Sequence, residues 1–278
     1  THLQDATPIR LGQEFSGYVQ QICNGITRLK NSQGLLSELA QGGTAVGTGI
    51  NTHKEFGSRI AKELSTLSGV KFTEATNHFE AQAAQDAAVE TSGALKTLAV
   101  SLSKIANDIR WLGSGPRAGL GEITLPAVQP GSSIMPGKVN PVICEAMIQV
   151  CAQVIGNDTA ITIGGMGGVF ELNLMLPVIA HNLLQSIHIL NGACVMFKVN
   201  LVDNVEADEK ACSDYIEGSL AMCTSLAPVI GYDKAAHLAH VAYETGKTVR
   251  EVAMEENILP EDELSRLLDP RSMTEPNS

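Results

Sequence analysis

Long stretches with apolar residues at helical spacing are the feature that most constrains the fold of this chain. Residues 9–39 and 79–112 carry apolar side chains three or four positions apart, which is typical of a helix packed on one face. Two further stretches, 141–161 and 170–202, are apolar on more than one side, so we expect several neighbours to cover them. Pro177 should kink or locally break the second of these. None of the stretches shows the strict alternation of apolar and polar residues that is typical of a strand. The pattern therefore predicts an all-α protein.

The composition favours helices that pack closely against one another. Only 4% of the 278 residues are aromatic, whereas 44% are hydrophobic, so Ala, Leu, Ile and Val must form most of the core. Small side chains allow helices to approach one another closely. We therefore expect residues 1–205 to form the central domain, a long up-and-down helical bundle. Helices that are apolar on several sides also predict association into a symmetric homo-oligomer.

The pattern changes after about residue 205. The predicted helices become short, and glycine and proline separate them. Asp233 and Thr248 are candidate N-caps, because their side chains can accept hydrogen bonds from the first turn of a helix. We expect residues 206–278 to form a small C-terminal helical domain. The expected helices cover residues 206–223, 233–244, 248–256 and 260–268.

Charge and cysteine content exclude several classes of function. The net charge of −11, with no basic run, argues against a nucleic-acid surface. No signal peptide and no apolar run long enough to span a bilayer is present. The six cysteines show neither a CxxC motif nor metal-ligand spacing, so free thiols in a reducing compartment are expected. The histidines also lack ligand spacing, and we assign no metal site.

Residues 131–141, Gly-Ser-Ser-Ile-Met-Pro-Gly-Lys-Val-Asn-Pro, are unlike the rest of the chain. Glycine and proline keep this run out of regular structure. A surface turn is one interpretation, with hydroxyls that cap the turn and a solvated lysine. The other is a binding loop, because backbone N–H groups, a cation and an amide together can hold an anionic oxygen. A serine of this loop, if deprotonated there, could remove a proton from carbon.

The same run carries a resemblance to a known family. It is similar to the signature of the fumarase/aspartase superfamily, Gly-Ser-Ser-x-Met-Pro-x-Lys-x-Asn-Pro. Residues 1–8, Thr-His-Leu-Gln-Asp-Ala-Thr-Pro, resemble the family's Thr-His-x-Gln-Asp-Ala segment. Residues 42–49 and 170–173 also look like class II fumarases and aspartases. The similarity runs from Thr1 to about Met273. It implies the all-α fold expected above, with the signature loop in a fumarase-like central domain.

The resemblance implies roles for individual residues. The catalytic base toward carbon maps onto Ser132. His2, paired with Glu145, would act on the side of the water and the leaving hydroxyl. The substrate-binding residues implied by the resemblance are Thr1, Ser133, Lys138, Val139 and Asn140.

The implied activity is the reversible hydration of fumarate to L-malate, a tricarboxylic acid cycle reaction, without a metal or an organic cofactor. Two alternatives stay open: an aspartate ammonia-lyase, and a non-catalytic helical assembly subunit. The family forms homotetramers, with each active site built from three subunits. A cytoplasmic location is expected, or the mitochondrial matrix in a eukaryote. Full-length relatives carry a long segment before the Thr-His motif, so we expect that part to be a separate chain or to have been removed.

Overall fold

A computed structural model describes residues 1–276 of the chain, and helices dominate it. The prediction of an all-α fold is confirmed, since every strand of the described part has two residues. The helices are α1 (Leu11–Leu36), α2 (Phe56–Ser68), α3 (His78–Ala83), α4 (Asp86–Leu112), α5 (Val142–Gly165), α6 (Leu176–Asn200), α7 (Glu209–Gly218), α8 (Ala227–Ile230), α9 (Tyr232–Thr245), α10 (Val249–Glu255) and α11 (Glu261–Leu267).

Short strands and 3₁₀ turns fill some of the connections. The turns are η1 (Val202–Asn204), η2 (Leu220–Ser225) and η3 (Pro270–Met273). The strands pair as β1 (Glu38–Leu39) with β2 (Thr73–Glu74) in parallel, β3 (Ile123–Thr124) with β6 (Glu206–Ala207) antiparallel, and β4 (Gly168–Val169) with β5 (Leu172–Asn173) antiparallel.

The chain divides into two compact units. The bundle unit comprises Val19–Trp111 and Leu125–Val205. The terminal unit comprises Thr1–Tyr18, Leu112–Thr124 and Glu206–Ser278. The predicted boundary between two domains at residues 205 and 206 stays a prediction. The terminal unit also includes two earlier segments, Thr1–Tyr18 and Leu112–Thr124, beside the C-terminal helices.

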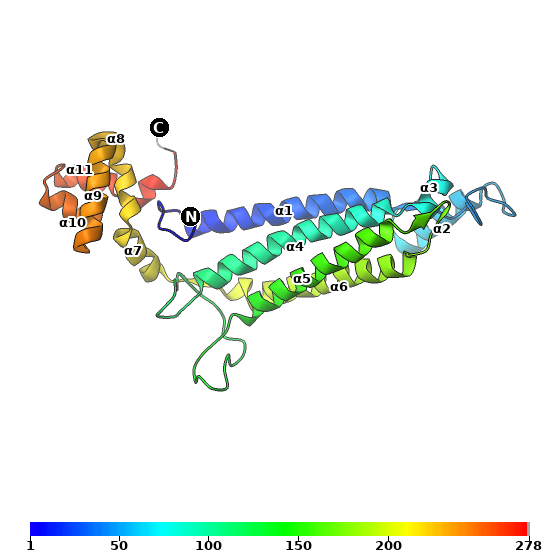
Figure 1. The fold of residues 1–278 in the computed structure, drawn as a ribbon, viewed down its shortest axis with the longest axis horizontal. Helices are drawn as coiled ribbons and strands as arrows, with labels where there is room; N and C mark the ends of the chain where they lie inside the picture. The colour runs from blue at the N-terminus through cyan, green and yellow to red at the C-terminus, as the bar shows by residue number, and fades with distance from the viewer. Residues whose placement is uncertain (277–278) are drawn as a thin grey trace. The chain divides into compact units, whose positions relative to one another are not determined.

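The bundle unit is built from long helices that lie alongside one another (Figure 1). α5 and α6 make the most extensive contact between elements of the chain. Small residues let the helices approach: a Cβ on Gly25 of α1 would lie 2.8 Å from Leu98 of α4. The core that they enclose is aliphatic, with Ile109, Met147 and Ile161 among its fully buried side chains. This is the long helical bundle that the sequence predicts.

Ser92, Lys96 and Asp158 join α4 to α5 through polar contacts in the bundle unit. The Ser92 hydroxyl on α4 donates a 2.8 Å hydrogen bond to Asp158 Oδ1 on α5. Lys96 Nζ, one turn further along α4, lies 2.6 Å from Asp158 Oδ2. Ser92 and Asp158 are buried, whereas the Lys96 side chain is 45% exposed. A buried carboxylate needs partners of this kind to remain charged in a helical interior.

The C-terminal helices of the terminal unit surround an aliphatic cluster of their own. Leu226, Leu238 and Leu264 are fully buried in it. Thr248 is the N-cap of α10, as predicted, and forms a capping box with Glu251. The prediction for Asp233 is wrong: Gly231 is the N-cap of α9, and Asp233 lies in the first turn.

The predicted helix over residues 170–202 also begins later than expected. Pro177 does not kink α6, because it occupies the first turn, where its missing N–H has no helical partner to lose. The residues before α6 form the β4–β5 hairpin instead. Among residues 1–276, no helix is long and apolar enough to cross a membrane.

Candidate functional site

Residues 131–141 form an irregular loop that leads into α5 at one end of the bundle unit (Figure 1). Together with the preceding residues, the loop borders an open cavity of about 410 Å³. Ser132, Gly137, Lys138 and Val139 line this cavity together with residues 127–130. A serine and a lysine of the loop therefore border the same space, which is large enough for a small organic acid.

Ser132 is held by its own loop. Its Oγ accepts hydrogen bonds from the backbone N–H of Ile134 at 3.2 Å and of Met135 at 3.0 Å. Two N–H donors that converge on one oxygen stabilise negative charge there, as in an oxyanion hole. The hydroxyl thus caps the turn, as the surface-turn interpretation predicts, and the same two donors would also stabilise an alkoxide at this position.

The other predicted substrate ligands of the loop differ in exposure. Ser133, Lys138 and Val139 are exposed, and Asn140 is half-buried. The Asn140 amide donates a 3.0 Å hydrogen bond to the carbonyl of Gly131 at the start of the loop. In residues 1–276, Lys138 has no ion-pair partner, so its charge is available to an anion in the cavity.

Glu145 lies in the first turn of α5, where a carboxylate is favoured by the helix dipole. Its neighbour Cys144 is buried, and burial raises the pKa of this thiol to about 11. Arg110 of α4 acts in the opposite direction, and Glu145 raises the pKa further. A thiol with this pKa is protonated near neutral pH and is not a candidate nucleophile. Sequence reasoning missed Arg110, because only the packing of α4 beside α5 brings it near Cys144.

Thr1 and His2 belong to the terminal unit, where both are exposed. A tight turn holds them: the backbone N–H of Gln4 donates to the Thr1 carbonyl at 2.9 Å. His2 and Leu3 adopt positive φ angles of 55° and 59° in this turn. Glu145 belongs to the bundle unit, so the pairing of His2 with Glu145 stays a prediction.

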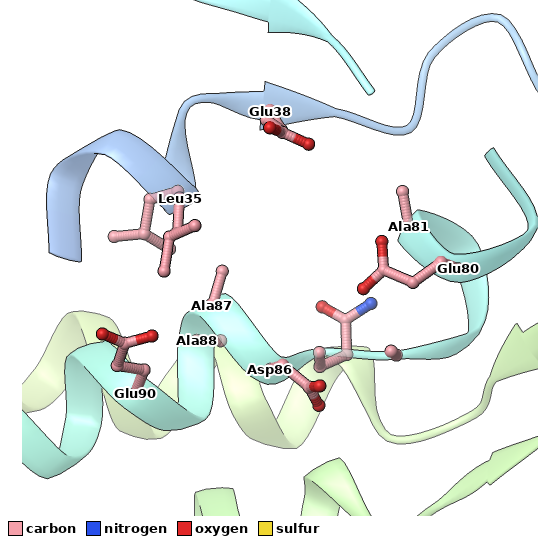
Figure 2. Close-up of a pocket in the computed structure, with 11 residues that line it drawn as sticks. Leu35, Glu38, Glu80, Ala81, Asp86, Ala87, Ala88 and Glu90 are labelled. Atoms are coloured by element: carbon pink, nitrogen blue, oxygen red, sulfur yellow. The ribbon is translucent and has the colours of Figure 1, made fainter. Parts of the chain in front are cut away.

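A second cavity of about 370 Å³ lies at the other end of the bundle unit, between the end of α1, α3 and the start of α4 (Figure 2). Glu38, Glu80, Asp86 and Glu90 line it, and no lysine, arginine or histidine does. Four carboxylates would repel a dicarboxylate, so this cavity is not the candidate site. Within the described part of the chain, no group of His, Cys, Asp and Glu side chains could hold a metal ion.

Comparison with known proteins agrees with a helical lyase. A family described as "Lyase" matches residues 1–156, and "Fumarase C C-terminus" matches residues 222–275. The chain is 54% identical to the mitochondrial fumarate hydratase of Rhizopus oryzae, over 98% of this chain and 55% of that protein. It is also 54% identical to the class II fumarate hydratase of Neisseria meningitidis, over 99% of this chain and 60% of the relative.

A solved structure gives the same result for the fold. The crystal structure of a class II fumarase from Schistosoma mansoni superposes with a TM-score of 0.96 at 38% identity. It matches 100% of this chain and 61% of that one. The fold is that of a helical lyase, and the chain belongs to the lyase family, whose model matches more than half of it. The chain spans little more than half the length of these relatives.

Proposed function

We propose that the chain carries the Ser132 side of an active site that hydrates fumarate to L-malate reversibly. The observation that supports this most directly is the pair of backbone N–H groups on Ser132 Oγ, in a loop that also presents Lys138 to the cavity. The relatives named fumarate hydratase support the choice of reaction. These relatives also favour hydration over the aspartate ammonia-lyase alternative.

In the direction from malate, Ser132 as an alkoxide takes a proton from the methylene carbon. The electron pair of the C–H bond moves onto the adjacent carboxylate, which becomes a dianionic aci-carboxylate. Lys138 and the Asn140 amide stabilise this charge more than they stabilise the ground state. The hydroxyl then leaves from the opposite face as water, taking up a proton, and fumarate remains.

The water side of the reaction falls to His2 in this proposal. Glu145 pairs with the imidazole and sets its tautomer, so that the other ring nitrogen transfers the proton of the water. Thr1, Ser133 and Val139 contribute contacts to the substrate. His2 and Thr1 belong to the terminal unit and the loop to the bundle unit. As the fumarase/aspartase resemblance implies, each active site would be assembled from several copies of the chain.

A homotetramer is the assembly that we propose. α5 and α6 expose large apolar side chains along much of their length, and such surfaces are stable when other helices cover them. Ile155 and Ile163 of α5 and Leu184 and Val195 of α6 are examples, each between 39% and 66% exposed. The relatives are longer than this chain. Turnover would therefore also require the part of them that this chain does not match. A cytoplasmic or mitochondrial-matrix location follows from the same proposal.

The test is the absorbance of fumarate formed by the complete native protein from L-malate and, separately, from L-aspartate. Production from malate alone is the expected result. Production from aspartate alone would replace hydration by ammonia elimination. If neither substrate reacts and calorimetry detects no heat with fumarate, malate or malonate, the non-catalytic assembly role is the better interpretation.

A further inference from the structure

Two hydrogen bonds close the signature loop at its base. The Gly131 N–H donates to the Lys138 carbonyl at 2.8 Å. The Gly131 carbonyl in turn accepts the Asn140 side-chain amide at 3.0 Å. The N–H and the carbonyl of Gly131 are therefore both used to join the two ends of the loop. Residues 131–138 form a ring, rather than an open turn.

Gly131 fits at this position because a side chain would not. A Cβ there would lie 2.6 Å from the backbone nitrogen of Asn140 and 2.6 Å from the Lys138 carbonyl oxygen. These are backbone atoms, which cannot move aside without opening the ring. The φ angle of Gly131 is not positive, so close approach, and not a left-handed conformation, is what requires glycine. Gly137 requires glycine for the opposite reason: its φ angle is +80°, whereas an added Cβ would have no atom within 4 Å.

Inside the ring, Met135 connects the serine to the lysine. Its backbone N–H donates to Ser132 Oγ at 3.0 Å, and its carbonyl accepts the Lys138 N–H at 3.3 Å. The hydroxyl and the lysine backbone are thus bonded to the same residue. While the ring is closed, the Ser132 hydroxyl and the Lys138 backbone therefore keep a fixed relative position.

We propose that Gly131 and Asn140 are positioning residues that hold Ser132 and Lys138 as one unit for the reaction. The proposal rests on the function proposed above. An asparagine amide carries two hydrogens. One holds the Gly131 carbonyl, and the other can bind a substrate carboxylate, so Asn140 joins the ring to the substrate. The predicted role of Asn140 as a ligand and its observed contact in the loop are then compatible.

The experiment uses Gly131→Ala, which opens the ring without removing any functional group, in the complete native protein. We expect kcat for malate to fall by about 100-fold, because small misplacements of reacting groups have effects of this size. KM should change by less than about threefold, since no binding group is lost. The midpoint of thermal unfolding should not move, because the loop lies outside the aliphatic core.

A second readout does not depend on activity. Hydrogen–deuterium exchange, measured by mass spectrometry on peptides that cover residues 127–142, reports the ring directly. Exchange should become faster in Gly131→Ala and in Asn140→Asp, whose carboxylate would repel the Gly131 carbonyl. Gly137→Asn is the matched control, because asparagine tolerates a positive φ and a Cβ at this position has no atom within 4 Å. The slow exchange should persist in this variant.

The two proposals fail in different ways. If the unaltered protein converts malate, and Gly131→Ala keeps both its kcat and the slow exchange, the ring has no positioning role. A loss of activity that only parallels a lower unfolding midpoint would overturn it as well. If the unaltered protein converts neither malate nor fumarate, the proposed function fails; faster exchange in both variants would still support the ring.

Discussion

The bundle unit contains two serine–lysine pairs, and they are used in opposite ways. Ser92 and Lys96 lie on α4, and both contact the carboxylate of Asp158. Ser132 and Lys138 lie in the signature loop and contact no carboxylate among residues 1–276. The first serine donates its hydrogen to a buried anion. The second accepts two backbone N–H groups on its oxygen.

The direction of the hydrogen bond separates the two serines chemically. A hydroxyl that donates to a carboxylate would place two negative charges together if it lost its proton to solvent, so Ser92 is poorly placed to act as a base. Negative charge on a hydroxyl oxygen is stabilised when the oxygen accepts from two N–H groups, which is why we propose Ser132, and not Ser92, as the base. The lysines differ for the same reason: Asp158 neutralises Lys96, whereas Lys138 can attract an anion.

The largest expected effect comes from removing the hydroxyl of the loop. Ser132→Ala should abolish turnover of malate in the complete native protein, a loss of about 1,000-fold or more, because the base toward carbon is gone. Assembly, measured by light scattering coupled to size-exclusion chromatography, should not change. Steady-state rates from fumarate absorbance provide the comparison with the unaltered protein.

Ser92→Ala is the matched control for this substitution. It removes a hydroxyl of the same kind from the same unit, and kcat should stay within about twofold of the original value, because Ser92 lies outside the reacting geometry. Near-normal turnover by Ser132→Ala would remove Ser132 from the mechanism. An equal loss in both variants would mean that the contrast between the serines is false.

The lysines provide the next test of the comparison. Lys138→Met should lower kcat/KM by about 100-fold to 1,000-fold, the range found when one donor to a developing oxyanion is removed. Lys96→Met leaves the buried Asp158 carboxylate without its ammonium partner, so the free energy of unfolding should fall by about 2–3 kcal/mol, with kcat/KM unchanged. If Lys96→Met impairs catalysis as strongly as Lys138→Met, the two ammonium groups do not differ as argued.

Periodicity in the sequence was enough to predict the long helices but not their ends. The apolar spacing over residues 141–161 is a property of the segment itself, and α5 follows it closely. The start of α6 depends on where Pro177 is tolerated, and the start of α9 on the left-handed backbone of Gly231. Both are decided by the local backbone, which apolar spacing does not report.

The candidate site was predictable in its residue types and not in its contacts. The run of residues 131–141 indicates an anion-binding loop by composition alone. Glycine is required at position 131 because the backbones of Lys138 and Asn140 approach it closely. The sequence alone does not show this approach. The pair of Ser92 and Asp158 is separated by 66 residues and follows only from the packing of α4 beside α5.

The smallest effect in the comparison is the effect of Ser92→Ala on stability. The substitution leaves Asp158 Oδ1 without its 2.8 Å donor in a buried position. Loss of one hydrogen bond to a buried charged group should lower the free energy of unfolding by about 1–3 kcal/mol. Lys96 still pairs with the other oxygen of the carboxylate, so the lower half of this range is expected. Urea unfolding followed by circular dichroism measures the change at a fixed protein concentration, and no change at all would mean that the buried contact contributes nothing to the bundle.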